Sequence, residues 1–380
     1  MVRIEKDGGS LPGLIPFELV LHRKNMSLMA LGLYVISTLV IAATLLPFWR
    51  THRWWVRLCD FPRFQVAILG LAIVVSLPLV RWPLSTFEIL LTGGVATSVL
   101  WQLSWVWRYF PGAPKEVPSS SAAPPTATSI SLLTINVFQK ARDAGALINI
   151  IFDSDPDVVF AVETDEWWCS VLTDALRSHY PYILIYPLSN GYGLALFSRL
   201  ELIEPTIRFL VDEAIPSIKA GIRLRSASVI DLYGMHPQPP APHQDSAERD
   251  TELLRVAREV RASKRPSIVL GDLNDVAWSR TTSDFKEAGG LLDPRRGRGF
   301  FNTFPAAVPG LRYPLDYIFH SPHFAVSDMR VLPRCQSDHL PLIAKLCIEP
   351  ATRDETESDV LLATSTESLP HSTIKRDHRP

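Results

Sequence analysis

Six short polar peptides lie at the ends of apolar runs between residues 130 and 348. They supply carboxylates, amides and imidazoles, the groups that bind hard cations and transfer protons in hydrolytic enzymes. Delivered by buried strands to one edge of a fold, such side chains would form a single polar pocket on rigid supports. In chain order the peptides are Asn136, Glu163, His236-Pro237, Gly271-Asp272-Leu273-Asn274, Leu315-Asp316-Tyr317-Ile318 and Ser337-Asp338-His339.

Two of these peptides have an ordinary structural explanation beside the chemical one. Glu163 follows the apolar run DVVFAV, and a carboxylate at a strand end is often simply solvated. Gly271 permits a tight turn after the run IVL, so that Asp272 and Asn274 project toward one side, although the same residues also form common Asx turns. The ordered set of six, rather than any single peptide, is what indicates a site.

Asp316 and the pair Asp338-His339 differ in what they require. Asp316 interrupts an apolar strand, where an unpaired carboxylate is costly, so it needs a cation or a hydrogen-bond donor. Asp338 and His339 are adjacent, and adjacent residues in a strand point to opposite faces. Asp316 is therefore the better candidate to orient the His339 imidazole.

The elements that must position these residues alternate along the chain. Amphipathic spacing predicts helices at 142–153, 167–178 and 244–262. Many strands with fewer helices predict an α/β fold in which sheet packs on sheet and the helices lie outside. The predicted strands are 130–136, 157–163, 193–198, 227–236, 266–272, 315–320 and 341–348.

Three uncharged apolar stretches precede this region and explain a mean hydropathy of +0.12 in a chain whose net charge is -1. Residues 26–48, 64–80 and 89–107 are each long enough as helices to cross, or nearly cross, about 30 Å of hydrocarbon. Seven of the ten tryptophans crowd the ends of these stretches, where an amphipathic ring lies at headgroup level. We predict a membrane domain, residues 26–110, with three transmembrane helices in a lipid bilayer.

Basic residues predict the orientation of the chain in a cell membrane. Arg23-Lys24 favour a cytoplasmic N-terminal segment, residues 1–25, whereas four arginines in the first loop favour the opposite arrangement. We predict that the N-terminus is inside, which three spans convert into an extracytoplasmic catalytic region.

Two segments and the cysteines predict no chemistry. Residues 111–129 are rich in proline, alanine and serine with little apolar bulk, so we predict an extended linker between domains. Residues 349–380 are rich in serine, threonine and charge, which predicts a disordered tail. The four cysteines form no C-x-x-C pair, so neither a zinc knuckle nor a disulfide framework is predicted.

The six peptides, taken in order, resemble the endonuclease/exonuclease/phosphatase superfamily over essentially all of residues 130–348. Three preceding spans, with HPQPP after the middle strand, are most similar to its membrane-anchored bacterial branch. The resemblance implies a four-layer α/β sandwich, two packed sheets flanked by helices, and hydrolysis of phosphate ester bonds. It also implies Mg²⁺ as cofactor, with Mn²⁺ as the alternative, because both prefer oxygen ligands.

The resemblance further implies a role for each matching residue. Glu163 matches the principal metal ligand, Asn136 the amide beside it and Asp338 a second acidic position near the metal. His339 matches the general base that activates water, and Asp316 the carboxylate that orients its ring. Asp272 and Asn274 would position the nucleophile and the scissile phosphate, and His236 would donate a hydrogen bond to a phosphoryl oxygen.

Charge argues against nucleic acid as the favoured substrate. Residues 130–348 hold 23 basic and 26 acidic side chains, a balance poorly suited to gripping a polyanion. The basic cluster Arg295-Arg296-Gly297-Arg298 predicts a solvated loop, with Arg298 as the candidate substrate contact. We expect the phenylalanines at 300, 301 and 304 to pack rather than to face lipid.

The leading hypothesis is a membrane-anchored, Mg²⁺-dependent phosphoesterase that hydrolyses a phosphate ester, pyrophosphate or phosphodiester. The anchor favours a phosphorylated lipid or another envelope molecule as substrate, because it keeps the site near the bilayer. One alternative is a metal-dependent nuclease facing the extracytoplasmic space. A second is a non-catalytic binding module that keeps the fold, although every expected site position is filled.

Overall fold

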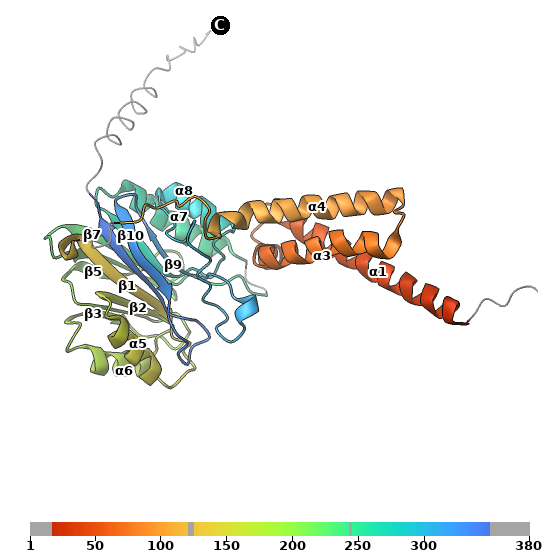
Figure 1. The fold of residues 1–380 in the computed structure, drawn as a ribbon. Coiled ribbons are helices and arrows are strands. Elements are labelled where there is room, and N and C mark those ends of the chain that lie inside the picture. The colour runs from red at the N-terminus through yellow and green to blue at the C-terminus, as the bar shows by residue number, and fades with distance from the viewer. Residues whose placement is uncertain (1–16, 121–124, 243–244, 350–380) are drawn as a thin grey trace, which may run out of the picture. The chain divides into compact units, whose positions relative to one another are not determined.

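The chain forms two units, which we describe separately. The computed structural model describes residues 17–120, 125–242 and 245–349, with side chains from residue 28 onward. One unit comprises residues 1–108 with 240–246 and is helical, and the other comprises 109–239 with 247–380 and holds both sheets (Figure 1). Most of the predicted N-terminal segment, 1–16, and the predicted tail from residue 350 lie outside the described residues.

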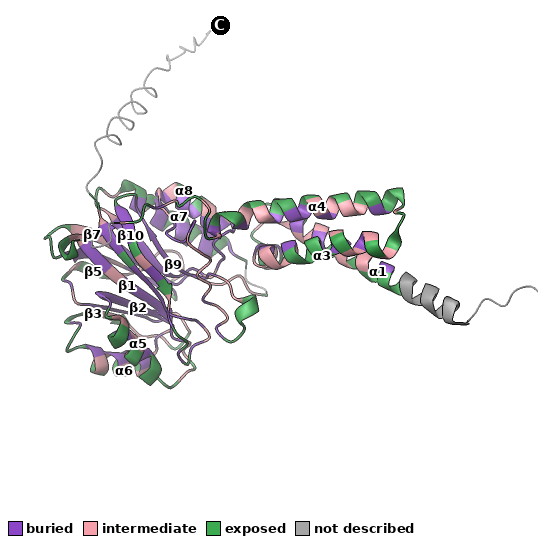
Figure 2. Cartoon of the chain, in the orientation of Figure 1, coloured by how far each residue is buried: buried purple, intermediate pink, exposed green. Residues whose placement is uncertain are grey.

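Three helices of the first unit are long and apolar enough to span a membrane. They are α1 (Phe17–Leu45), α3 (Arg63–Arg81) and α4 (Thr86–Val106), with the short α2 (Trp54–Arg57) between the first two. Their candidate spans are Leu28–Phe48, Arg63–Arg81 and Thr86–Tyr109, close to the predicted stretches. Many of their large apolar side chains are exposed, and Figure 2 marks the exposed residues of these helices in green.

Small and polar side chains hold these helices together. A Cβ atom on Gly70 of α3 would lie 2.6 Å from Cγ2 of Val99 on α4, so the close approach requires glycine. Gln102 accepts a hydrogen bond from Arg63 Nη1 at 3.0 Å and donates to Thr44 Oγ1 at 3.0 Å. These two bonds link all three helices through buried polar groups.

Two mixed sheets form the centre of the second unit. The first has the order β10-β11-β1-β2-β4-β3 and the second the order β5-β6-β7-β8-β9. In each sheet one pair is parallel, β1 with β2 and β7 with β8, and the other pairs are antiparallel. The strands are β1 (Ser129–Asn136), β2 (Val158–Val162), β3 (Tyr182–Tyr186), β4 (Leu194–Ser198), β5 (Leu202–Phe209), β6 (Pro216–Arg223), β7 (Val229–Met235), β8 (Ser267–Asp272), β9 (Asp316–His320), β10 (Phe324–Val331) and β11 (Leu342–Ile348).

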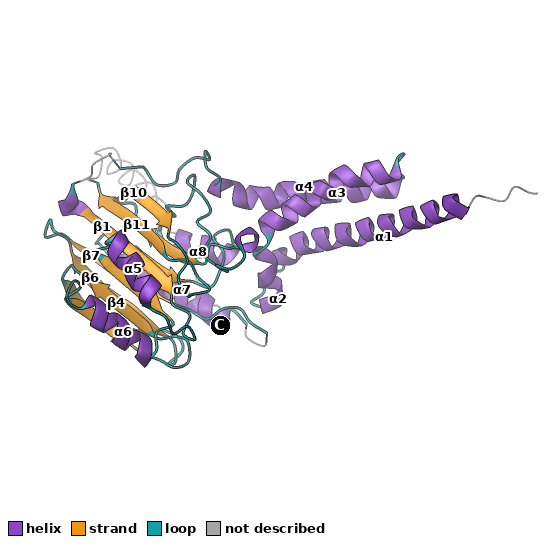
Figure 3. Cartoon of the chain, turned by 60° about the horizontal axis from the view of Figure 1, so that its bottom comes forward, coloured by secondary structure: helices purple, strands orange, loops and turns teal. Residues whose placement is uncertain are grey.

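Helices cover the outer face of each sheet. Helices α5 (Gly145–Ser154) and α6 (Glu166–Leu176) lie across the six-stranded sheet, where they share an apolar cluster with β1 and β2 (Figure 3). Helices α7 (Ala247–Ala262) and α8 (Arg280–Gly289) lie against the five-stranded sheet, with Phe285 of α8 packed 5.9 Å from Phe319 of β9 between ring centroids. The predicted four-layer α/β sandwich is confirmed.

Some elements escaped prediction for physical reasons. Helix α8 is mostly polar, and Phe285 is its one large apolar side chain, so no periodic stripe marks it. Strand β5 is an edge strand that contains Pro205 and charged residues, and much of it is exposed. Strands β3, β6 and β10 were not predicted either.

Part of the predicted linker, 111–129, packs on the second unit, which corrects the expectation of an extended tether. Val117 is fully buried in the core between the sheets. Val326 of the edge strand β10 donates to Pro118 O at 3.0 Å and accepts from Ser120 N at 3.0 Å. One apolar side chain and an open sheet edge therefore hold residues 117–120 against the second unit, although the composition of the segment is typical of a linker.

Candidate active site

Strand alternation brings four of the predicted residues to one face. Leu132, Leu232, Leu270 and Ile318 belong to the core between the two sheets. Residues an even number of positions away along the same strand keep that side. By this rule the inter-sheet face also holds four buried polar residues at the strand ends, Asn136, His236, Asp272 and Asp316.

Glu163 reaches this face by a different route. It follows β2, in which Val159 and Ala161 point toward the helices, so regular alternation would turn Glu163 the same way. Its backbone instead adopts a left-handed conformation, with φ of 63°. The Glu163 carboxylate then accepts hydrogen bonds from Asn136 Nδ2 at 2.8 Å and Gln139 N at 3.1 Å. Positive φ in a glutamate is costly, so surrounding contacts must hold it.

Asn136 joins the two sheets at the site. Its side-chain amide donates to Glu163 Oε1, and also to Asp272 Oδ2 of the other sheet at 3.2 Å. The backbone carbonyl oxygen of Asn136 accepts a hydrogen bond from Ser337 Oγ at 2.6 Å, and Ser337 Oγ accepts one from His339 N at 2.9 Å. The loop before β11 is thereby fixed against the end of β1.

His339 and Asp316 form a buried pair, as the sequence predicts. Asp316 Oδ2 lies 2.8 Å from His339 Nδ1, and Asp272 Oδ2 lies 3.6 Å from His339 Nε2. Burial alone would lower the pKa of His339, but these two carboxylates outweigh it and raise the pKa to about 10. The ring of Phe304 covers the imidazole at 4.8 Å between centroids.

The turn at the end of β8 is both an Asx turn and the support of a carboxylate at the site. Gly271 has φ of 132°, and a Cβ atom there would lie 2.0 Å from Met235 O, so only glycine fits. Asn274 N donates to Asp272 Oδ1 at 2.9 Å, which is an Asx turn, and Asn274 Nδ2 donates to Pro237 O at 2.9 Å. The Asx turn thus fixes a carboxylate that also faces Asn136 and His339.

His236 lies at the edge of this cluster. Its Nε2 is 3.8 Å from Asp272 Oδ2, and the ring of Tyr192 packs 5.4 Å away between centroids. Burial lowers the pKa of His236 to about 4 despite the Asp272 charge. The imidazole is therefore neutral at pH 7 and keeps one N–H that can donate.

Carboxylates dominate the charge of the site. Asp272, Asp316 and His339 each place a ligand atom within 4.8 Å of the others. Burial raises the pKa of Asp272 and of Asp338, and in Asp338 the nearby charges of Glu163 and Asp272 add to the effect. These oxygens suit a hard divalent cation, and Asp316 Oδ1 is buried with no hydrogen-bond partner among the described residues.

The predicted metal residues border this group rather than forming it. Asn136 and Glu163 join it through the hydrogen bond that the Asn136 side-chain amide donates to Asp272. Asp338 joins it electrostatically, and its carbonyl oxygen accepts from Ala306 N at 2.6 Å. The two sets offer carboxylate and amide oxygens, the ligands that hard cations prefer, so the residues present fit a metal such as Mg²⁺ or Mn²⁺.

The structure does not bring Arg298 to the site. Its guanidinium donates to Pro294 O at 3.1 Å, to Val117 O at 2.8 Å and to Ser119 Oγ at 3.1 Å. The basic cluster is not a solvated loop either, since Arg295 is 1% exposed. The prediction of a solvated loop considered the positive charges of this cluster alone and left out the carboxylates that pair with them. The expected packing holds for Phe300, whose ring lies 5.8 Å from that of Trp278.

Sequence reasoning missed several supporting residues. Arg249 of α7 is almost fully buried and donates to Asn274 O at 3.0 Å, while also pairing with Asp275 at 3.2 Å. An arginine on the apolar face of an amphipathic helix was a readable signal. Tyr192 and Phe304, which pack on the two histidines, lie in loops where no local pattern marks them.

Comparisons with known proteins agree with the fold described above. A sequence model of the endonuclease/exonuclease/phosphatase family matches residues 133–339. An endonuclease/exonuclease/phosphatase from Bacteroides vulgatus has the same fold, with a TM-score of 0.50, 18% identity, and coverage of 58% of this chain and 100% of that one. No curated protein matches.

Two further solved structures are similar. One is an endonuclease/exonuclease/phosphatase from Beutenbergia cavernae, with a TM-score of 0.49, 17% identity, and coverage of 59% of this chain and 72% of that one. The other is D. rerio TDP2 complexed with a single-strand DNA product, with a TM-score of 0.49, 18% identity, and coverage of 58% and 99%. On the sequence match and the shared fold, the chain belongs to the endonuclease/exonuclease/phosphatase family.

Proposed function

We propose that this protein is a membrane-anchored, metal-dependent phosphoesterase. The observation that carries the proposal is the joining of the half-buried pair Asn136–Glu163 to the buried pair Asp316–His339 through the carboxylate of Asp272. One pair offers oxygen ligands and the other an oriented imidazole, which is the minimum equipment for activating water against a phosphate ester.

Each residue has a proposed task. Glu163, Asn136 and Asp338 hold the cation, which we propose to be Mg²⁺ or Mn²⁺. Asp316 fixes the ring of His339 so that Nε2 faces the site, where it accepts the proton of the attacking water. Asp272 and Asn274 orient that water and the phosphate, and neutral His236 donates to a phosphoryl oxygen.

The paired carboxylates favour the protonated form of His339, and a protonated ring cannot accept a proton. A divalent cation would supply positive charge that offsets these carboxylates and would stabilise the charge that develops on the phosphoryl and leaving-group oxygens. Arg298 takes no part in this proposal, because its guanidinium is committed to backbone and Ser119 groups.

The proposed substrate is a phosphorylated lipid or another envelope molecule. Support comes from the three apolar helices, whose outer side chains include Leu79, 80% exposed, and Leu100, 70% exposed. Such surfaces suit a hydrocarbon environment and would keep the site close to membrane substrates. We further propose that the catalytic unit is extracytoplasmic.

The test uses the full-length protein in detergent with four probes: bis(4-nitrophenyl) phosphate, phosphatidic acid, a polyprenyl pyrophosphate and plasmid DNA. We expect hydrolysis with Mg²⁺ that EDTA abolishes. Glu163→Gln and His339→Asn should each lower kcat by about 10²- to 10⁴-fold. The control is Glu201→Gln, an exposed residue paired with Arg223, which should behave as wild type.

Three outcomes would overturn parts of the proposal. Equal rates in wild type and both site variants would remove the assignment of the site. A rate on plasmid DNA above the rates on both lipid probes would replace the phosphoesterase by a nuclease. Absence of Mg²⁺ or Mn²⁺ binding in calorimetry, together with no hydrolysis of any probe, would leave a non-catalytic binding module.

A further inference from the structure

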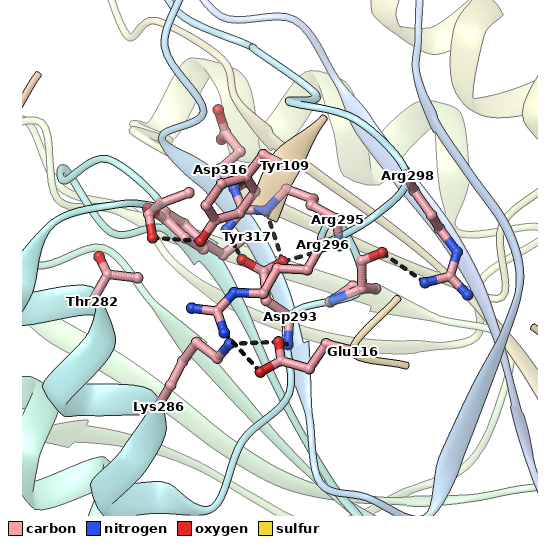
Figure 4. A network of polar contacts seen from close by, with 12 residues as sticks. Tyr109, Glu116, Thr282, Lys286, Asp293, Arg295, Arg296, Arg298, Asp316 and Tyr317 are labelled. Carbon is pink, nitrogen blue, oxygen red and sulfur yellow. Dashed lines mark hydrogen bonds and ion pairs between the residues drawn. The ribbon is translucent and has the colours of Figure 1, made fainter. Parts of the chain in front are cut away.

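A buried guanidinium lies directly behind the strand that carries Asp316. Arg295 makes a two-pronged ion pair with Asp293, with Nε 2.9 Å from Oδ1 and Nη2 3.0 Å from Oδ2 (Figure 4). Its Cζ lies 4.0 Å from the ring centroid of Tyr317, and its Nη1 is 3.4 Å from Asp316 O. The guanidinium of Arg295 therefore contacts both the backbone oxygen of Asp316 and the ring of Tyr317, the first two residues of β9.

The segment just after the third apolar helix completes this network. Glu116 Oε2 lies 2.6 Å from Lys286 Nζ on α8 and accepts from Asp293 N at 2.8 Å. Glu116 Oε1 accepts from Arg296 Nη1 at 3.0 Å. One carboxylate thus ties together a helix, the backbone of the 293–298 loop and a second arginine (Figure 4).

The charge count shows why Glu116 matters. Three cations meet here, Lys286, Arg295 and Arg296, against the carboxylates of Asp293 and Glu116. Lys286, Arg295 and Asp293 are each less than 5% exposed, so water screens them little. Without Glu116 a single carboxylate would face three cations. The buried ion pairs would then lose the partner that balances them, which is more costly than at a surface.

Backbone packing binds the same two segments. Gly297 has φ of 74°, and a Cβ atom there would lie 2.5 Å from Ala113 O. Arg298 donates to Val117 O and Ser119 Oγ, so the 293–298 loop wraps around residues 113–119. A displacement of residues 113–119 must therefore move the 293–298 loop. Arg295 in this loop contacts the backbone oxygen of Asp316, so the displacement also reaches Asp316.

We propose that Glu116 and Arg295 are positioning residues for His339, acting through the backbone of Asp316. This inference rests on the proposed function for its kinetic consequence. The path runs from Glu116 to the 293–298 loop, through Arg295 to Asp316, and from Asp316 Oδ2 to His339 Nδ1. The segment that follows the membrane helices is then part of the support of the active site, and not only a connection to it.

The test compares Glu116→Gln with Glu201→Gln in the full-length protein. Glu201 also pairs with an arginine, at 2.7 Å, but is exposed and distant in the fold from β9. We expect Glu116→Gln to lower kcat on bis(4-nitrophenyl) phosphate about 10- to 100-fold, with KM within twofold of wild type, because small displacements of catalytic groups are this costly. Arg295→Lys keeps the charge but not the planar fork, and should show the same split.

A second readout does not depend on activity. In protein with ¹⁵N-labelled histidine, the signal lost in His339→Asn identifies the His339 ring. That signal should shift or broaden in Glu116→Gln and in Arg295→Lys, and stay unchanged in Glu201→Gln. If the wild type hydrolyses none of the probes but the signal shifts, positioning stands and the proposed function fails. An unchanged signal with unchanged kcat in Glu116→Gln, even with a lower melting temperature, overturns the positioning role.

Discussion

Glu252 on α7 is a buried carboxylate whose charge is costly to the folded chain. Its side chain is 4% exposed, and Oε1 has no hydrogen-bond partner among the described residues. Burial, with a contribution from Asp212 and against that of Arg208, raises the pKa of Glu252 from 4.5 to about 7. The negative charge of Glu252 also contributes to raising the pKa of Tyr192, whose ring packs on His236. A neutral Glu252 therefore keeps negative charge away from the proposed phosphate contact.

The direction of the pH dependence follows from this shift. Below pH 4.5 the group is protonated in both the folded and the unfolded chain and contributes nothing. Between pH 4.5 and 7 the unfolded chain releases a proton that the folded chain keeps, so the free energy of unfolding falls as pH rises. Over this pH interval the free energy of unfolding falls by about 3 kcal/mol, at about 1.4 kcal/mol per pH unit. The full penalty is present above pH 7.

The assay is urea unfolding of the full-length protein in detergent at pH 5 and pH 8. Replacing Glu252 by Gln removes the titration, so the loss of stability between these two pH values should be smaller than in wild type by about 2.5 kcal/mol. The matched control is Glu248→Gln on the same helix, where the side chain is exposed. If Glu252→Gln and wild type lose the same stability over this range, the carboxylate ionises freely in the folded chain and the burial argument is wrong.

Three further predictions test the geometry, two of them with a control substitution. Gly271→Ala places a methyl group against Met235 O and should destabilise the chain by about 2–4 kcal/mol in urea unfolding, whereas Gly191→Ala, in open space, should cost about 1 kcal/mol from its positive φ alone. Val117→Ala should lower the free energy of unfolding by about 1–2 kcal/mol, because Val117 lies in the core, and Val308→Ala, at an exposed residue, should lower it by less than about 0.5 kcal/mol. Equal losses in the two variants would support the extended linker predicted for residues 111–129. His236→Ala should lower kcat/KM about 10- to 100-fold, the value of one hydrogen bond to a charged group, and an unchanged kcat/KM would remove His236 from phosphate binding.

The residues that face the site were predictable where strand alternation alone decides their direction. Asn136, Asp272 and Asp316 each end or begin an apolar run, and their parity matches that of the core leucines and isoleucines. A one-dimensional pattern carries this information because a strand has a fixed period of two. The pairing of Asp316 with His339 was also predicted, but on the premise that Asp338 and His339 lie in a strand, whereas they lie in the bend before β11.

What could not be predicted depends on contacts between distant parts of the chain. The left-handed backbone of Glu163 is set by Asn136 and Gln139, and nothing in DVVFAVE signals it. Arg298 looked like a substrate contact because its partners, Val117 and Ser119, lie about 180 residues earlier. Composition described 111–129 as a tether because the strand edge that it joins appears only in the folded sheet.

The hydrogen bond between Ser337 and Asn136 joins residues 201 positions apart, and β11, the last strand among the described residues, lies between β10 and β1. The six-stranded sheet therefore cannot close until the chain has been synthesised through Ile348. Long-range pairing of this kind slows folding, because the entropy of loop closure is lost before the contacts form. A nascent chain that already presents Asn136 and Glu163 lacks His339, so the proposed site stays incomplete until residue 339 has been synthesised.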